Sequence, residues 1–190
     1  MSSMLTHQDI ELRQLAPQDG QLLIDLDKAG CNIGLIGLPE SLQECHVIFQ
    51  SLESQMWSTP MTALSAGTPF GAFWTALPNV SNLNALVVTL FEDLDRGGVA
   101  LALYIRHLFW SFPLHRLYTH VGALDRGSGY SAIYEGIGFK REGILKEHAL
   151  LAGRRQDIVV YGLLREEFDR CMLAFDPALS LAGVDASGRR

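Results

Sequence analysis

Cysteine is scarce in this chain, and the scarcity argues against a structural metal site. Only 3 of the 190 residues are cysteines, Cys31, Cys45 and Cys171, and they lie far apart. No CxxC pair and no cluster of cysteine and histidine has the spacing of a zinc site, so we expect no bound metal. An odd, sparse cysteine count is typical of a reducing cytosol, so we expect a cytoplasmic protein.

Basic residues are also few, which bears on partners. Lys and Arg number 15 against 21 Asp and Glu, giving a formal charge of -6. Binding to nucleic acid or to an anionic membrane surface needs a cluster of Lys and Arg, and the sequence has none. We therefore expect no nucleic-acid or membrane partner, whereas a basic substrate is easier to accommodate.

Long hydrophobic runs are missing as well. The most apolar segment, Gly98 to Leu114, carries Arg106 and His107 near its middle and is shorter than the ~20 residues that a transmembrane helix needs. It predicts a helix buried in a globular protein. Residues 1–15 have neither a basic start nor a continuous apolar stretch, so we expect no secretory signal.

Apolar side chains are plentiful. Hydrophobic residues make up 48% of the chain and charged residues 19%, which is enough for one large core at this length. The patterning predicts a strand, two helices, three strands, a helix, a strand, a short helix, a hairpin and a last helix. This order predicts one mixed α/β domain over residues 1–175, followed by a small-residue tail over 176–190.

The individual boundaries follow from turn residues and periodicity. The expected strands are Ile10 to Leu15, Thr59 to Ala66, Pro69 to Leu77, Ala85 to Phe91, Leu117 to Val121, Glu142 to Leu151 and Asp157 to Leu164. The expected helices are Pro17 to Ala29, Leu38 to Trp57, Val99 to Phe112, Tyr130 to Ile137 and Arg165 to Phe175. The continuous apolar run of Ala85 to Phe91 is typical of a strand buried on both faces, so we expect it at the centre of the sheet. The segment from Gly30 to Gly37 is rich in glycine, which predicts a loop.

The segment from Tyr130 to Phe168 is the most informative about function. It contains a motif whose members are Tyr134, Glu135, Gly138, Phe139, Glu142 and Gly143, then Gly153, Arg154 and Asp157, and last Tyr161 and Leu163. These residues resemble the signature of the GCN5-related N-acetyltransferases (GNATs), especially the ribosomal-protein and antibiotic acetyltransferases. The resemblance implies a mixed sheet of about seven strands flanked by helices.

The resemblance also implies a binding site for acetyl-CoA. In GNATs the cofactor lies where two parallel strands splay, and its pyrophosphate meets a helix N-terminus through the pattern R/Q-x-x-G-x-G/A, where backbone N–H groups and the helix dipole attract phosphate. The positions that match these contacts are Leu90, Phe91, Arg96, Gly97, Gly98, Val99 and Ala100. The departures are Asp95 where the family has Arg or Gln, Gly127 where many members have Asn, and Tyr130 where some have Ser. The alternative for residues 96–98 is a plain turn before a helix.

Acetyl transfer needs an uncharged amine, a base for its proton and an acid for the departing thiolate. Tyr134 matches the tyrosine with which many GNATs protonate the CoA sulfur. For the base we expect Glu92 first, with Asp93 and His120 as further candidates. Each has a structural alternative: Tyr134 as a core tyrosine, Glu92 and Asp93 as solvated loop charges, and His120 as an edge histidine.

The resemblance therefore predicts an N-acetyltransferase that moves acetyl, or another short acyl group, from acyl-CoA to a primary amine by direct attack. The acceptor is expected to be a small molecule or a peptide, such as an aminoglycoside, a polyamine or a ribosomal-protein N-terminus, and a homodimer is compatible with it. The alternative is a GNAT-fold binding or regulatory module without catalysis, which Asp95 and Gly127 favour.

Overall fold

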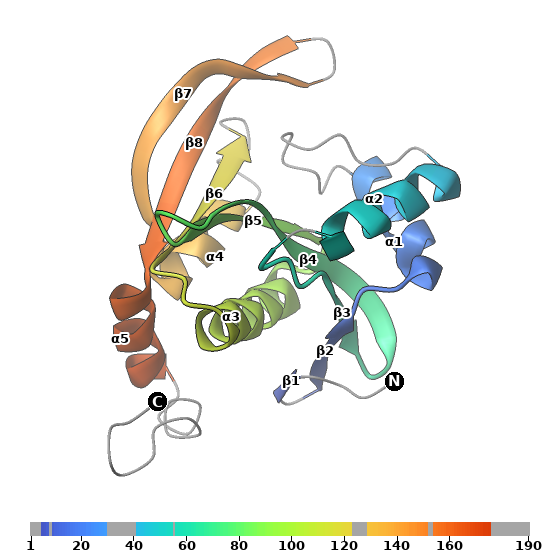
Figure 1. The fold of residues 1–190 in the computed structure, drawn as a ribbon, viewed down its shortest axis with the longest axis horizontal. Coiled ribbons are helices and arrows are strands. Elements are labelled where there is room, and N and C mark those ends of the chain that lie inside the picture. The colour runs from blue at the N-terminus through green and yellow to red at the C-terminus, as the bar shows by residue number, and fades with distance from the viewer. Residues whose placement is uncertain are drawn as a thin grey trace.

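The fold is built on one mixed sheet of eight strands, in a computed structural model that describes residues 5–7, 9–29, 41–54, 56–122, 129–151 and 154–175. The spatial order of the strands is β1-β2-β3-β4-β5-β6-β8-β7 (Figure 1). The strands are β1 (Leu5–His7), β2 (Ile10–Gln14), β3 (Met61–Ser65), β4 (Thr68–Asn79), β5 (Asn84–Phe91), β6 (Arg116–Gly122), β7 (Lys140–Leu151) and β8 (Arg154–Leu164). The helices are η1 (Pro17–Asp19), α1 (Gly20–Lys28), α2 (Leu42–Ser54), α3 (Leu94–Ser111), α4 (Tyr130–Ile137) and α5 (Arg165–Phe175).

The element order predicted from the sequence is confirmed, and the differences lie in the number and the ends of the elements. Strands β7 and β8 begin at Lys140 and Arg154, before the predicted Glu142 and Asp157. The sheet has one strand more than expected, because Leu5–His7 pairs with β2, and three residues are too few to show alternation. Strand β4 continues to Asn79. Helix α3 begins at Leu94 rather than Val99, because the Asp93 side chain caps it. The loop expected at 30–37 and the tail at 176–190 lie outside the described residues.

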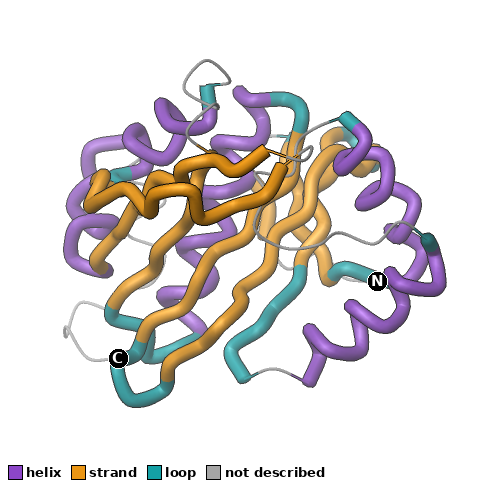
Figure 2. Tube along the Cα trace, turned by 90° about the horizontal axis from the view of Figure 1, so that it is seen from above, coloured by secondary structure: helices purple, strands orange, loops and turns teal. Residues whose placement is uncertain are grey.

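Strand β5 is central, as predicted, and its alternating side chains enter two separate hydrophobic clusters. Ala85, Val87 and Phe91 pack with α3, α4 and α5 on one face of the sheet. Leu90 packs with α1 and α2 on the other face. Figure 2 shows helices on either side of the strands. A strand covered on both faces needs a continuous apolar sequence, which explains the pattern of this segment.

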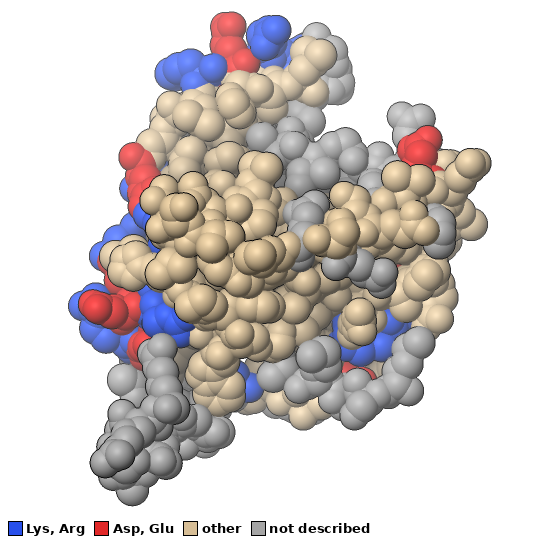
Figure 3. Space-filling model, in the orientation of Figure 1, with Lys and Arg blue, Asp and Glu red and all other residues tan. Residues whose placement is uncertain are grey.

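The hydrophobic cluster on the face covered by α3, α4 and α5 contains most of α3. Leu101, Ile105 and Leu108 of this helix are fully buried. The helix is thus the buried one expected from the apolar segment, and within the described residues no helix is long and apolar enough to span a membrane. Charged side chains are visible mainly over the β7/β8 hairpin and α5, and the middle of the same face carries few (Figure 3).

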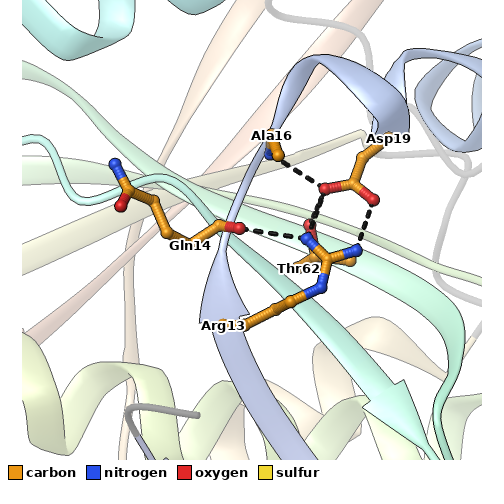
Figure 4. A network of polar contacts seen from close by, with 5 residues as sticks. All are labelled: Arg13, Gln14, Ala16, Asp19 and Thr62. Carbon is orange, nitrogen blue, oxygen red and sulfur yellow. Dashed lines mark hydrogen bonds and ion pairs between the residues drawn. The ribbon is translucent and has the colours of Figure 1, made fainter. Parts of the chain in front are cut away.

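A buried ion pair ties the second strand to the first helices (Figure 4). Arg13 binds Asp19 through both carboxylate oxygens, at 2.6 and 2.7 Å, and Thr62 of β3 donates to the same carboxylate at 2.8 Å. Burial alone would raise the pKa of Asp19, but these hydrogen bonds and one from the Ala16 amide outweigh it and lower the pKa. The pair therefore stabilises the fold above about pH 4, and that contribution is lost as the pH falls through the lowered pKa.

The ladder between β5 and β6 is short, and this prepares the functional site. These strands run parallel and pair over three residues only, ending at Leu86 opposite Tyr118. Beyond that point β5 stays paired with β4 up to Phe91, and β6 with β8 up to Gly122. The sheet is therefore divided between residues 87–91 of β5 and 119–122 of β6, a region that we call the strand gap.

Candidate active site

Three hydroxyl groups meet where the strand gap begins. Tyr134 of α4 is fully buried, and its Oη lies 2.6 Å from Thr89 Oγ1 of β5. Thr119 of β6 lies 3.5 Å from the same Oη and also donates to the Val87 carbonyl at 3.0 Å. We call Thr89, Thr119 and Tyr134 the hydroxyl cluster. Through this cluster the phenol of Tyr134 contacts both strands next to the end of their ladder.

The residues around Tyr134 hold its ring in place. Its ring packs at right angles to Phe139, with centroids 5.2 Å apart, and stacks on Tyr161 at 6.2 Å. Tyr161 donates in turn to Glu135 of the same helix as Tyr134. Gly138 ends α4 at a φ of 108°, a left-handed conformation that favours glycine. All of these residues belong to the sequence motif, so part of that motif serves to position Tyr134.

The N-terminus of α3 lies at the far end of the strand gap, and a carboxylate already occupies it. Asp93 accepts a hydrogen bond of 2.9 Å from the Arg96 amide, and its backbone carbonyl accepts one from Gly97. The Arg96 side chain lies 3.6 Å from the same carboxylate. The pKa of Asp9 is lowered by a hydrogen bond from Ser65 and, to a smaller degree, by the charge of Arg96. Arg96 therefore lies among carboxylates.

The residues expected to contact a cofactor at this end are helical rather than a loop before a helix. Gly97 packs so closely that a Cβ there would overlap the ring of Phe91, whereas a Cβ on Gly98 would make an ordinary contact with Ile133 of α4. Leu90, Phe91 and Ala100 have buried side chains. These side chains therefore belong to the core, and only backbone atoms of these positions are placed to meet a ligand. Val99 is half-buried and Arg96 is exposed.

A second tyrosine reaches the end of β5. Tyr130, one helical turn before Tyr134, donates a hydrogen bond to the Phe91 carbonyl, and the Tyr130 and Phe91 rings lie 4.8 Å apart. Alternate residues of a strand direct their backbone groups to the same side, so the carbonyls of Val87 and Phe91 both face the gap. Thr119 and Tyr130 each bind one of them. Sequence reasoning treated Tyr130 only as a departure from the family pattern and missed this contact.

On the other face of the sheet the gap is bordered by two histidines. Successive residues of β6 point to opposite faces, so His120 lies opposite to Thr119 and Tyr134. The ring of His120 is half-buried, 5.7 Å from Tyr118 and 6.4 Å from His148. Burial, and then the charge of His148, lower the pKa of His120. His120 is therefore neutral at pH 7 and able to accept a proton.

A bulge in β7 presents His148. The pairing of β7 with β8 is interrupted between Leu145 and Ala149, and Glu147 has a φ of 48°. The Asp157 carboxylate of β8 accepts the Glu147 amide at 2.9 Å and pairs with Lys146 at 2.8 Å. Bulges commonly redirect a side chain beside a functional site. Asp157, a motif residue, thus supports the bulge that carries His148.

The two acidic candidates for the base lie farther along the gap. Glu92 follows β5 directly and is exposed. It is three residues past Thr89, about 10 Å at the ordinary rise of a strand. The Asp93 carboxylate is engaged as the cap of α3. The geometry thus brings Tyr134 and His120 to opposite faces at the start of the gap and leaves Glu92 at its far end.

The side chains at the start of the gap are suited to moving protons. Within the described ranges no group of three or more His, Cys, Asp or Glu side chains is arranged to hold a metal ion. The hydroxyl cluster offers uncharged donors and acceptors on one face of the sheet, and His120 offers a neutral imidazole on the other. The arrangement places a candidate proton donor on one face of the sheet and a candidate proton acceptor on the other.

Comparison with known proteins shows what this fold resembles. The sequence matches no protein-family model and no curated protein. A point mutant of the spermidine N-acetyltransferase SpeG from Vibrio cholerae is 18% identical, with a TM-score of 0.73 over 84% of this chain and 96% of that chain. RimJ from Mycobacterium smegmatis, in complex with CoA-disulfide, is also 18% identical, with a TM-score of 0.70 over 87% of this chain and 88% of that chain.

Proposed function

Because this chain has the GNAT fold, we propose that it is an N-acetyltransferase using acetyl-CoA, or another short acyl-CoA, to acetylate a primary amine. The observation that carries the proposal is the hydroxyl cluster at the start of the strand gap, where a buried tyrosine touches both separating strands. Fold alone does not determine chemistry, whereas the residues of this site supply groups that the reaction needs.

The residues present fit acetyl-CoA better at one end of the gap than at the other. Residues 87–91 of β5 have no ladder partner on the β6 side. Thr119 and Tyr130 bind the carbonyls of Val87 and Phe91, so the backbone of Thr89 between them is the part that can meet an extended ligand arm. At the other end, Asp93 and Asp95 surround the α3 N-terminus with negative charge, which opposes a pyrophosphate. When bound, the cosubstrate supplies an acyl thioester whose sulfur leaves as a thiolate.

Two side chains serve the proton transfers. Tyr134 donates its phenolic proton to the leaving sulfur from the α4 face, and His120 accepts the proton of the attacking amine from the opposite face. The C–N bond forms and the C–S bond breaks. His120 takes one proton from the amine, and Tyr134 gives one proton to the sulfur. We place His120 before Glu92 as the base, because His120 borders the gap beside Thr119 whereas Glu92 lies beyond it.

The acceptor is a small-molecule or peptide amine. One structural neighbour is a spermidine N-acetyltransferase, and the acidic charge of this chain is compatible with a cationic amine. A homodimer and a cytoplasmic location stay predictions. The second candidate function is a GNAT-fold binding module that has lost turnover, and the carboxylates of Asp93 and Asp95 at the α3 N-terminus favour it.

Thiol release tests the proposal directly. The purified chain is incubated with acetyl-CoA and a panel containing spermidine, an aminoglycoside and peptides with free N-termini, and free CoA thiol is measured against time. We expect thiol release that depends on one class of amine and nearly disappears in Tyr134→Phe. Stabilisation by CoA in a thermal shift without any turnover would favour the binding module, and neither binding nor turnover would overturn both.

A further inference from the structure

Thr89 is a buried polar residue that the sequence motif left without a role. It is the one polar residue of the run Ala85 to Phe91, and it is only 3% exposed. A buried hydroxyl costs stability unless it is hydrogen-bonded. The Thr89 hydroxyl is hydrogen-bonded to that of Tyr134 at 2.6 Å. The polar residue in the apolar run of β5 is therefore the one that contacts this tyrosine.

The two threonines of the hydroxyl cluster differ in what they can offer Tyr134. A threonine hydroxyl has one proton and two lone pairs. Thr119 directs its proton to the Val87 carbonyl at 3.0 Å and reaches the phenol only at 3.5 Å. Thr89 lies at 2.6 Å, and either oxygen of that pair can be the donor. Thr89 can therefore accept from the phenol or, after rotating its proton, donate to it.

We propose that Thr89 is a positioning residue for Tyr134, accepting a hydrogen bond from its hydroxyl in the free protein and donating one to its oxygen during proton transfer. This inference rests on the proposed function. In the step concerned, the Tyr134 O–H bond breaks, an S–H bond forms on the leaving thiolate, and the phenolate keeps its negative charge until a solvent proton replaces the one lost. A donor at 2.6 Å stabilises that charge, since hydrogen bonds to ionised oxygens are the strong ones.

The test separates the hydroxyl of Thr89 from the shape of its side chain. Thr89→Val removes the hydroxyl and nearly keeps the shape, whereas Thr89→Ser keeps the hydroxyl and loses the methyl group. Thr75→Val is the matched control, because Thr75 is equally buried on the neighbouring strand β4 but its hydroxyl donates to the Trp57 carbonyl at 2.6 Å. We expect Thr89→Val to lower kcat about tenfold with an unchanged KM for acetyl-CoA. Thr89→Ser should restore most of kcat, and Thr75→Val should stay within about twofold of wild type.

Two further readouts separate positioning from mere stability. In a Tyr134→Phe background, Thr89→Val should cause no further loss of kcat, because the group that it positions is gone. In protein labelled with carbon-13 at the tyrosine Cζ, the Tyr134 resonance should move in Thr89→Val and return in Thr89→Ser. The resonance can be assigned through Tyr134→Phe and needs no turnover.

The outcomes divide clearly. Wild-type turnover with equal kcat in Thr89→Val would overturn the inference and leave the proposed function standing. Equal fold-losses from Thr89→Val with and without the Tyr134→Phe substitution would also overturn it. If wild type shows no turnover with any amine, the catalytic role of Thr89 is overturned together with the proposed function. If the Tyr134 Cζ resonance does not move in Thr89→Val, the proposed positioning of Tyr134 by Thr89 is overturned as well.

Discussion

The two ends of the strand gap are built differently. At the end where the β5/β6 ladder stops, Thr89, Thr119 and Tyr134 are buried and uncharged, and each threonine is hydrogen-bonded to the tyrosine. The end formed by the α3 N-terminus carries the carboxylates of Asp93 and Asp95, and the Asp93 carboxylate already accepts a hydrogen bond from the Arg96 amide. One end is suited to proton transfer, and the other resists the phosphates that should anchor a cofactor.

This difference indicates that the reacting end and the anchoring end have separate requirements. A buried cluster is constrained by packing on every side, whereas an exposed helix terminus tolerates substitution. We therefore expect a catalyst with ordinary turnover but weak affinity for acyl-CoA. Substitutions at one end should therefore leave the kinetic constant that depends on the other end unchanged.

The largest effect is expected at the reacting end. Tyr134→Phe removes the proton donor while keeping the buried ring, so kcat should fall at least about 100-fold, the lower limit for losing a general acid. The KM for acetyl-CoA should change little, because the anchoring end is untouched. Steady-state thiol release measures both constants. A tenfold rise in KM with unchanged kcat would mean that Tyr134 binds the cofactor instead.

The next effect concerns the histidines. His120→Gln should lower kcat/KM about 30-fold at pH 7 if His120 is the base. Because its pKa is lowered by burial and by His148, His120 stays neutral below its usual titration range, and kcat/KM should fall only as the pH drops through that lowered pKa.

His148→Gln provides the matched comparison for that titration. Removing the His148 charge raises the pKa of His120, so the acid limb of kcat/KM should move to higher pH. The same acceptor amine is used for both proteins, so its own titration cancels in the difference. Superimposable pH profiles for wild type and His148→Gln would mean that His148 does not influence the titration of the base.

A smaller effect is expected at the anchoring end. Asp95→Arg restores the charge that the GNAT pattern has at this position and should lower the KM for acetyl-CoA about tenfold, since exposed charges near a helix N-terminus act weakly. The value of kcat should be unchanged. Asp169→Arg makes the same charge reversal on α5, away from the gap, and should leave KM as in wild type. Equal effects of the two variants would mean that only net charge matters.

The smallest effect tests the cap itself. Asp93→Asn keeps a capping side chain but removes its charge, so the KM should fall about threefold with little change in thermal stability. Asp93→Ala removes both and should lower the Tm. If Asp93→Asn raises the KM, the carboxylate assists cofactor binding and the contrast between the two ends is wrong.

Much of the fold could be predicted because its signals are local. The turn at Ala66 and Gly67, the end of α4 at Gly138 and the apolar run of β5 each follow from a few neighbouring residues. The predicted start of helix α3 is five residues too late, because an Asp before an Asp-Arg-Gly-Gly stretch looks like a turn until the cap of Asp93 is seen. The three-residue strand β1 is too short for any periodicity.

The site could be predicted only in part, because its geometry depends on pairing between distant strands. Tyr134 came from the motif, and His120 from its position at the end of a strand. Thr89 and Thr119 are 30 residues apart in sequence, and only the parallel register of β5 and β6 brings them to one phenol. A threonine within an otherwise apolar buried strand was the signal that could have drawn attention to Thr89.

The short ladder between β5 and β6 also determines how the two parts of the sheet are joined. It joins two larger parts of the sheet, β1 to β5 and β6 to β8, through three paired residues at one end. Beyond the ladder, β5 is joined to β6 and α4 by side-chain hydrogen bonds from Thr119, Tyr130 and Tyr134. A ligand that enters between the two strands would therefore have to replace or lengthen the same hydrogen bonds that hold the phenol of Tyr134.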